Sequence, residues 1–134
     1  MTGSPGRGGA AIIGLGQTTF LKRGVSSCSA LELTLQAILA ACDDAGVSPE
    51  VLDGFVSYAN DGSEGLAVAA ALGVREVRWS SLVWGGGGGG VAAAVNAAAT
   101  AVTAGEADFI VVYRGLTQAG DGRQSYSKGH LDPL

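Results

Sequence analysis

Six consecutive glycines at residues 85–90 form the stretch of this chain with the clearest capacity for chemistry. They follow an apolar segment that ends at Trp84, and they precede an alanine-rich run over residues 91–104. This order predicts a strand, a tight turn and the start of a helix. The first N–H groups of a helix lack partners within it, and the helix dipole places positive potential beside them. Glycines leave the space above those groups open, so the turn is suited to an anion, a carbonyl oxygen or a nucleophile.

A second pair of candidates follows the almost continuous apolar run at residues 108–113. Tyr113 and Arg114 stand where this predicted strand ends, and open α/β sheets bind ligands beyond the carboxyl ends of their strands. The substrate-binding candidates are therefore Gly87, Gly88, Gly89, Gly90, Tyr113 and Arg114.

Other polar residues favour structural roles. Asp61 and Glu64 lie in turn chemistry before a helix, so we interpret them as turn and helix-cap acids. Asn96, within the alanine-rich helix, is expected to be a buried amide satisfied locally. His130, in a polar tail, is expected to be exposed.

A nucleotide site is an alternative interpretation of the glycines. Gly85, Gly87 and Gly90 satisfy the dinucleotide-binding pattern G-x-G-x-x-G, although six glycines satisfy it by default. The acidic residue that would hold a ribose at the end of the next strand is replaced by Tyr113 and Arg114. No Lys-Ser or Lys-Thr pair follows the glycines, which excludes a P-loop.

The composition indicates one domain that buries much of its surface. Of 134 residues, 47% are hydrophobic and 15% are charged. A net charge of −4 without basic clusters argues against nucleic acid as a partner. The apolar stretches are too short for a membrane span and residues 1–9 lack a signal-peptide core. We therefore expect a cytoplasmic protein.

The two cysteines, Cys28 and Cys42, lack the spacing of a metal site, and His130 is the single histidine in the chain. We expect neither a metal ion nor a disulfide.

The chain alternates strand and helix patterns, which predicts an α/β fold with a mostly parallel mixed sheet and a buried central helix. Ser29 and Glu32 form a capping box at the start of the first helix. The predicted order is a strand at 10–16, a helix from 29 to 46, a strand at 54–58, a helix at 64–72, a strand at 74–84, a helix at 91–104 and a strand at 108–113.

Three regions are expected. Residues 1–9 form a disordered leader rich in Gly, Ser and Pro, and residues 10–115 form the α/β domain. Residues 116–134 are polar and aperiodic, and we interpret them as a polar loop or a truncated connection.

Three stretches carry a family resemblance. They are Ala-Ile-Ile-Gly-Leu-Gly-Gln-Thr at 11–18, Ala-x-x-Asp-Ala-Gly-Val-Ser-Pro-Glu-x-x-Asp-Gly-Phe-Val at 41–56, and Ala-Gly-Glu-Ala-Asp-Phe-Ile-Val-Val-Tyr-Arg at 104–114. Over residues 10–115 the chain resembles the N-terminal half of the thiolase superfamily, with most similarity to sterol-carrier-type thiolases and lipid-transfer-protein aldolases.

This resemblance implies a β-α-β-α-β-α-β order and places the thiolase nucleophile at the start of the central helix. The matching position is Gly88, and neither Cys28 nor Cys42 can replace the missing cysteine. The resemblance therefore implies no thiolate acyl-enzyme chemistry. In the aldolase branch it implies retro-aldol cleavage of a steroid side-chain CoA ester, with acid and base tyrosines supplied by the absent C-terminal half.

Within that implied function, the N–H groups of Gly87 to Gly90 would hold the thioester carbonyl as it becomes an enolate. The resemblance also implies a homodimer through residues 74–84, a companion subunit with a CoA- or acyl-binding domain, and no cofactor beyond the CoA of the substrate. This chain alone is expected to be inactive. The alternatives are a non-catalytic lipid-carrier or assembly subunit and a dinucleotide-binding domain.

Overall fold

The structure is a computed structural model, and it describes residues 9–22, 26–59, 61–84 and 89–117. Its elements, in chain order, are the helix α1 (Ala30–Ala45), the 3₁₀ turn η1 (Pro49–Val51), the strand β1 (Gly54–Tyr58), the helix α2 (Gly65–Ala71), the strand β2 (Trp79–Val83), the helix α3 (Gly89–Thr103) and the strand β3 (Ile110–Val112). The expected leader lies outside the described residues except for Gly9, and so does the expected polar connection beyond residue 117.

The three strands form one parallel sheet in the order β2-β1-β3. Gly54 at the start of the central strand pairs with Trp79 of β2 and with Ile110 of β3. α2 connects β1 to β2, and α3 connects β2 to β3. This arrangement confirms the predicted α/β class, while the described part of the sheet is all parallel and not mixed.

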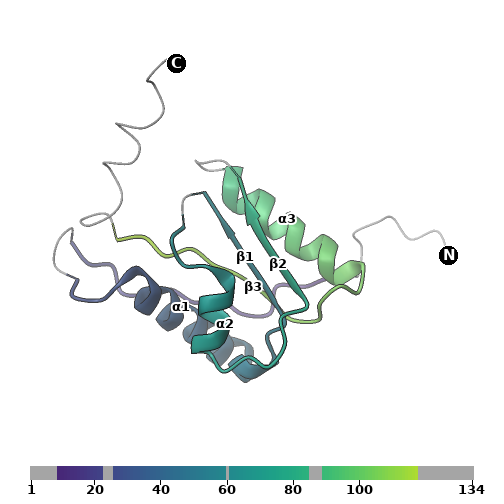
Figure 1. Ribbon diagram of the computed structural model, residues 1–134, viewed down its shortest axis with the longest axis horizontal. Coiled ribbons are helices and arrows are strands. Elements are labelled where there is room, and N and C mark those ends of the chain that lie inside the picture. The colour runs from purple at the N-terminus through teal and green to yellow at the C-terminus, as the bar shows by residue number, and fades with distance from the viewer. Residues whose placement is uncertain (1–8, 23–25, 60, 85–88, 118–134) are drawn as a thin grey trace, which may run out of the picture.

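Side chains alternate between two cores on the two faces of β1. Phe55 is fully buried and packs in a cluster with residues of α1 and α2. Val56, its neighbour, is equally buried but packs against Ala94 and Ala98 of α3. Figure 1 shows the resulting layers, with α1 and α2 on one side of the sheet and α3 on the other.

Local sequence signals set the ends of α1. Ser29 Oγ accepts a hydrogen bond from the Glu32 N–H, and the Glu32 carboxylate accepts one from the Ser29 N–H, which confirms the capping box. These hydrogen bonds with Ser29 lower the pKa of Glu32. Gly46 ends the helix with a φ of +69°, in the left-handed region that favours glycine.

α3 is covered by this chain on one face. Gly90, Ala94, Ala98 and Ala101 are its buried residues, and their small side chains allow the helix to lie close to the sheet. The opposite face is exposed and includes Asn96, which was expected to be a buried amide. The helix is therefore less enclosed in the single chain than the predicted buried central helix.

The predicted strand at residues 10–16 is wrong, because these residues form no strand. They lie along α1, where Gly14 and Gly16 approach the helix backbone so closely that a Cβ on either would clash with the carbonyls of Ala41 and Ala37, respectively. The Leu15 N–H is bonded to the Asp44 carboxylate at 2.9 Å and not to a neighbouring strand. An apolar run becomes a strand only where a partner strand accepts its main-chain hydrogen bonds.

None of the helices in the described part of the chain is both long and apolar enough to cross a bilayer.

Candidate functional site

The ends of the parallel strands define two edges of the sheet. At the carboxyl edge, β1 ends at Tyr58, β2 leads to Trp84, and β3 leads to Tyr113 and Arg114. α3 follows β2 and therefore starts at this same edge. The opposite end, which we call the amino edge, carries Asp53, Arg78, Gly105, Asp108 and Phe109.

Asp61 connects two segments of the carboxyl edge that are far apart in sequence. Its carboxylate accepts hydrogen bonds from the Ser57 hydroxyl at 2.7 Å, the Ser63 N–H at 2.8 Å and the Gly115 N–H at 2.9 Å. The bond to Ser63 is the turn role expected from sequence, and the bond to Gly115 is an unpredicted link to the segment after β3. Asp61 therefore fixes the loop after β1 against the residues that follow Arg114.

Gly115 lies where no larger residue fits. A Cβ at this position would overlap the Thr34 side chain and lie 2.8 Å from the Ala30 carbonyl oxygen of α1. Thr34 is buried, donates its hydroxyl to that carbonyl at 2.9 Å and contacts the Ser63 hydroxyl at 3.4 Å. Through Thr34, α1 therefore contacts both Ser63 and Gly115, which with Ser57 and Asp61 form what we call the Asp61 cluster.

Tyr113 is buried at this edge, and its hydroxyl donates to the Ser63 carbonyl at 2.6 Å. Burial, reinforced by the negative charges of Asp61 and Glu64, raises the pKa of Tyr113 to about 12. Through this hydrogen bond the neutral phenol of Tyr113 fixes the loop after β1. A phenol that stays protonated and is already hydrogen-bonded is poorly suited to act as a base at neutral pH. Glu64 occupies the cap position directly before α2, but its side chain forms no capping hydrogen bond.

Arg114 projects from the same segment toward the end of β1. Its guanidinium carbon lies 4.7 Å from the centroid of the Tyr58 ring, a cation–π contact. Arg114 Nε is buried and has no hydrogen-bond partner among the described residues. The structure thus places Arg114 at the predicted edge and leaves its charge uncompensated by any described carboxylate.

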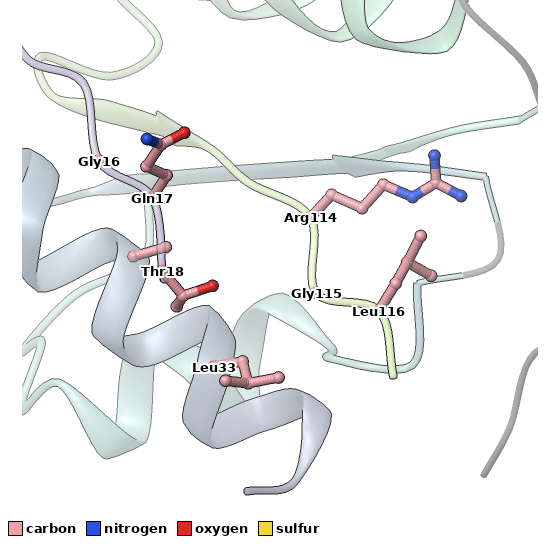
Figure 2. A pocket seen from close by; sticks show the side chains of 8 residues that line it. Gly16, Gln17, Thr18, Leu33, Arg114, Gly115 and Leu116 are labelled. Atoms are coloured by element: carbon pink, nitrogen blue, oxygen red, sulfur yellow. The ribbon is translucent and has the colours of Figure 1, made fainter. Parts of the chain in front are cut away.

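A pocket of about 260 Å³ lies beside this segment. Figure 2 shows Gln17 and Thr18 entering it from the N-terminal segment and Leu33 from α1, while Arg114 extends away from Gln17. The residues that line it are Gly16, Gln17, Thr18, Leu33, Ala37, Arg114, Gly115 and Leu116. Residues 16–18, which the sequence assigned to the end of a strand and a loop, therefore contribute a wall of the site region.

The glycine turn is described in part. Gly87 and Gly88, including the position that matches the thiolase cysteine, lie outside the described residues. Gly89 and Gly90 form the first turn of α3, two residues earlier than the predicted helix start at residue 91. A Cβ built on Gly89 meets nothing within 4 Å.

Neither cysteine belongs to a segment that follows β1, β2 or β3. Cys42 is buried in α1, and burial raises the pKa of its thiol. Cys28 precedes α1, where its sulfur accepts from Gln36. Among the residues that the structure describes, no group of three or more His, Cys, Asp or Glu could hold a metal ion. Asp108, which precedes β3, is paired with Arg78 at the amino edge.

Sequence reasoning missed the Asp61 cluster and the Tyr58–Arg114 stack. The Asn-Asp-Gly-Ser turn directly after a buried strand was the available signal, because such a turn must lie at the carboxyl edge. The partner of Asp61 in this turn could not be predicted, because the Gly115 N–H belongs to the segment after β3.

Comparisons with known proteins agree with this architecture. No protein-family model matches the sequence. The chain is 41% identical over 111 residues to a steroid side-chain-cleaving aldolase from Thermomonospora curvata, a match over 83% of this chain. It has the same identity and coverage to 17-hydroxy-3-oxo-4-pregnene-20-carboxyl-CoA lyase from Mycobacterium tuberculosis. The chain spans 28% of the length of each relative.

Solved structures give the same result. The Ltp2-ChsH2(DUF35) aldolase superposes with a TM-score of 0.75 at 37% identity, over 86% of this chain and 30% of that one. 3-Oxoacyl-[acyl-carrier-protein] synthase III from Aquifex aeolicus superposes with a TM-score of 0.54 at 22% identity over 65% of this chain, which supports the fold alone. The resemblance predicted from sequence is confirmed. The chain has a thiolase-like fold, and over 83% of its own length it is similar in sequence to a steroid side-chain-cleaving aldolase.

Proposed function

We propose that this chain is part of an aldolase that cleaves a carbon–carbon bond in a steroid side-chain CoA ester. The observation that carries the proposal is the 41% identity over 111 residues to two proteins whose names state this chemistry. The placement of the glycine turn and Arg114 at one edge of the sheet is consistent with a site for such an ester.

The proposed reaction is a retro-aldol cleavage. A base removes the proton from a hydroxyl on the carbon β to the thioester carbonyl, and that oxygen forms a ketone as the Cα–Cβ bond breaks. The electron pair of this bond passes to the thioester as an enolate, which an acid then protonates at Cα. The step needs no oxidant, but it requires stabilisation of the negative charge on the thioester oxygen.

The first turn of α3 is our proposed source of that stabilisation in this chain. Its first described residue, Gly89, lies at the positive end of the helix dipole, and a Cβ built on it meets nothing within 4 Å. We extend this role to Gly87 and Gly88, which precede it. A glycine at position 88 agrees with a reaction that forms no acyl-enzyme.

We propose a structural and not a catalytic role for Tyr113, because its hydroxyl already donates a hydrogen bond to the Ser63 carbonyl. The base and the acid must then come from elsewhere in the complete enzyme. This requirement agrees with the chain covering 28% of the length of its relatives, and it is why we propose that the chain alone does not turn over.

Two assemblies belong to this proposal. The name of the Ltp2-ChsH2(DUF35) aldolase pairs two components, which favours a companion subunit for this protein as well. A homodimer through residues 74–84 is favoured because β2 is an edge strand of the described sheet, paired only with β1. Leu82 of β2 is exposed, and Trp84, which follows β2, is 86% exposed. Light scattering of the purified protein and of a Leu82→Lys variant tests the dimer, since the lysine should yield monomers.

The activity is tested with the protein in the form in which its own cells produce it, together with any subunit that co-purifies. The substrate is 17-hydroxy-3-oxo-4-pregnene-20-carboxyl-CoA, and mass spectrometry follows the ketone and the shortened acyl-CoA. The control is the same ester without the 17-hydroxyl, which cannot undergo retro-aldol cleavage. Cleavage of the hydroxylated ester alone supports the proposal. Absence of cleavage in every preparation, or equal loss of both esters, contradicts it.

The second candidate is a non-catalytic assembly or lipid-carrier subunit. The exposure of Ile12, Ile13 and Leu15 along one segment favours it, because such side chains gain from a covering partner. In that case Gly88→Ala leaves complex formation and all chemistry unchanged, whereas in the aldolase it lowers turnover by crowding the thioester oxygen.

A further inference from the structure

The two arginines at the ends of the sheet, Arg78 and Arg114, differ in their hydrogen bonding. At the amino edge, Arg78 donates to the carboxylates of Asp53 and Asp108 and to the Gly105 carbonyl, all within 3.1 Å. Arg114, at the carboxyl edge, has no such acceptor among the described residues. Buried donors without a partner are rare in folded proteins, and a bound ion or a functional role is among their explanations.

Asp61, which is bonded to the same segment, does not pair with Arg114. Asp61 is linked to the same segment through the Gly115 N–H, but its two oxygens are already used by Ser57, Ser63 and Gly115. Asp61 forms no ion pair with Arg114. The local carboxylate thus fixes the backbone beside the arginine and leaves the positive charge free for something else.

The Tyr58 ring holds the guanidinium in a defined orientation. A ring 4.7 Å from the guanidinium carbon covers one face of the planar group, so its hydrogen-bond donors remain in the plane. Nε is the buried unpaired atom, whereas the two terminal nitrogens are not buried. Two parallel N–H groups at the open end of a fixed guanidinium match the two oxygens of a carboxylate or a phosphate.

We propose that Arg114 is an anion-binding residue whose terminal nitrogens take an oxyanion of the ligand, and that Tyr58 positions it. Two sources share this chemistry: a phosphate of CoA, or the free carboxylate of an acyl group released from CoA. The inference rests on the proposed function only for the choice of CoA as the natural source. The oxyanion site itself depends on the geometry of Arg114 and Tyr58.

The test is calorimetric titration of the chain with four probes: inorganic phosphate, acetate, CoA and pantetheine, which has the CoA thiol arm without its phosphates. Each is repeated on Arg114→Gln, Arg114→Lys and the matched control Arg75→Gln, which removes the same charge from an exposed arginine before β2. Arg114→Gln breaks no hydrogen bond to a described residue. It should therefore fold, and helical circular dichroism verifies this.

The expected result is that CoA and phosphate bind the unmodified chain and Arg75→Gln, and that Arg114→Gln weakens both by about 10-fold or more, the value of a charged hydrogen bond. Arg114→Lys should lie between, because it retains the charge without the paired donors. Tighter binding of CoA than of pantetheine identifies phosphate as the source, and tighter binding of acetate than of phosphate identifies a carboxylate.

A second measurement does not depend on the variants. The Nε–H resonance of Arg114 in an arginine-selective ¹H–¹⁵N spectrum should shift on addition of phosphate, while that of Arg75 should not. The inference is overturned if neither oxyanion moves that resonance, or if Arg114→Gln binds both as tightly as the unmodified chain. CoA binding that is independent of Arg114 leaves the proposed function standing without this site. Phosphate binding at Arg114 without cleavage of the ester removes the proposed function and leaves the site.

Discussion

The two edges of the sheet each carry an aspartate that binds main-chain N–H groups, but they differ in what they leave unpaired. At the amino edge, Asp53 accepts from the N–H groups of Asp108 and Phe109 and from Arg78. At the carboxyl edge, Asp61 accepts from two N–H groups and a hydroxyl, while the neighbouring Arg114 has no acceptor among the described residues.

Both edges combine an aspartate that accepts main-chain N–H groups with a neighbouring arginine, and they differ in whether that arginine is paired within the chain. At the amino edge the Arg78 cation is paired within the chain, since it forms ion pairs with both Asp53 and Asp108. At the carboxyl edge Asp61 is also fully hydrogen-bonded, but the Arg114 guanidinium, which stacks on Tyr58, has no ion-pair partner among the described residues. Nothing lies within 4 Å of a Cβ built on Gly89 at the start of α3. We propose that the carboxyl edge is organised for a ligand that the amino edge does not need.

Removing either aspartate should have the largest effect. Asp61→Ala leaves the N–H groups of Ser63 and Gly115 without an acceptor, and Asp53→Ala does the same to Asp108 and Phe109. Each should lower the free energy of unfolding by about 2–4 kcal/mol, as measured by urea denaturation.

The comparison predicts different consequences for binding. At temperatures where both variants remain folded, Asp61→Ala should also weaken CoA binding, because the segment that carries Arg114 loses its anchor. Asp53→Ala should leave CoA binding unchanged. Equal losses of CoA affinity in the two variants would remove the distinction between the edges.

Gly115→Ala tests the close contact between the carboxyl edge and α1. The new methyl group would overlap the Thr34 side chain and approach the Ala30 carbonyl, which should cost about 1–3 kcal/mol of unfolding free energy by overpacking. Gly46→Ala, at a position with open space but a φ of +69°, is a matched control that changes backbone strain alone. A thermal midpoint for Gly115→Ala equal to that of the unmodified chain would show that α1 does not support the site as described.

Tyr113→Phe should cost about 1 kcal/mol, since the Ser63 carbonyl loses a buried donor. The pKa of Tyr113 is raised from 10.0 to about 12 in the folded protein. Its contribution to stability is therefore complete below pH 10 and is lost as the pH rises toward about 12.

The measurement is the unfolding free energy of both proteins at a series of pH values above 9. The difference between them should shrink as the pH passes through this window. A difference that stays constant would mean that the Tyr113 hydroxyl is not held neutral by its surroundings.

The smallest expected effect has the opposite sign. Ala59, at the start of the loop that holds Asp61, has a φ of +59°, which disfavours residues with a Cβ. Ala59→Gly should stabilise the chain by about 0.5–1 kcal/mol, after the greater chain entropy of glycine is subtracted. Chemical denaturation resolves such a change, and a destabilised Ala59→Gly variant would show that the Ala59 methyl group contributes more through packing than its backbone costs.

Local signals predicted most of the fold. The Ser29–Glu32 capping box and Gly46 fixed the ends of α1 because both act within a few residues along the chain. The strand at 54–58 was placed correctly because it is apolar on both faces, as a central parallel strand must be. The α/β class followed from the alternation of strand and helix patterns, and the thiolase-like assignment followed from the resemblance carried by residues 11–18, 41–56 and 104–114.

The errors arose where the structure depends on distant partners. Residues 10–16 have the composition of a buried strand, yet Gly14 and Gly16 lie on α1. At the site, the sequence predicted that Arg114 would stand at the carboxyl edge, but not its stack on Tyr58 or the bond from Gly115 to Asp61. These contacts join residues more than 50 positions apart, which no local pattern specifies.

We propose that the carboxyl edge, and not the amino edge, receives the CoA ester. The most direct measurement is a titration of the ¹⁵N-labelled chain with CoA, followed in amide ¹H–¹⁵N spectra. We expect the amides of Gly89, Gly90 and Gly115 to shift while those of Asp108 and Phe109 stay in place. Shifts confined to Asp108, Phe109 and their neighbours, or no shift at saturating CoA, would contradict it.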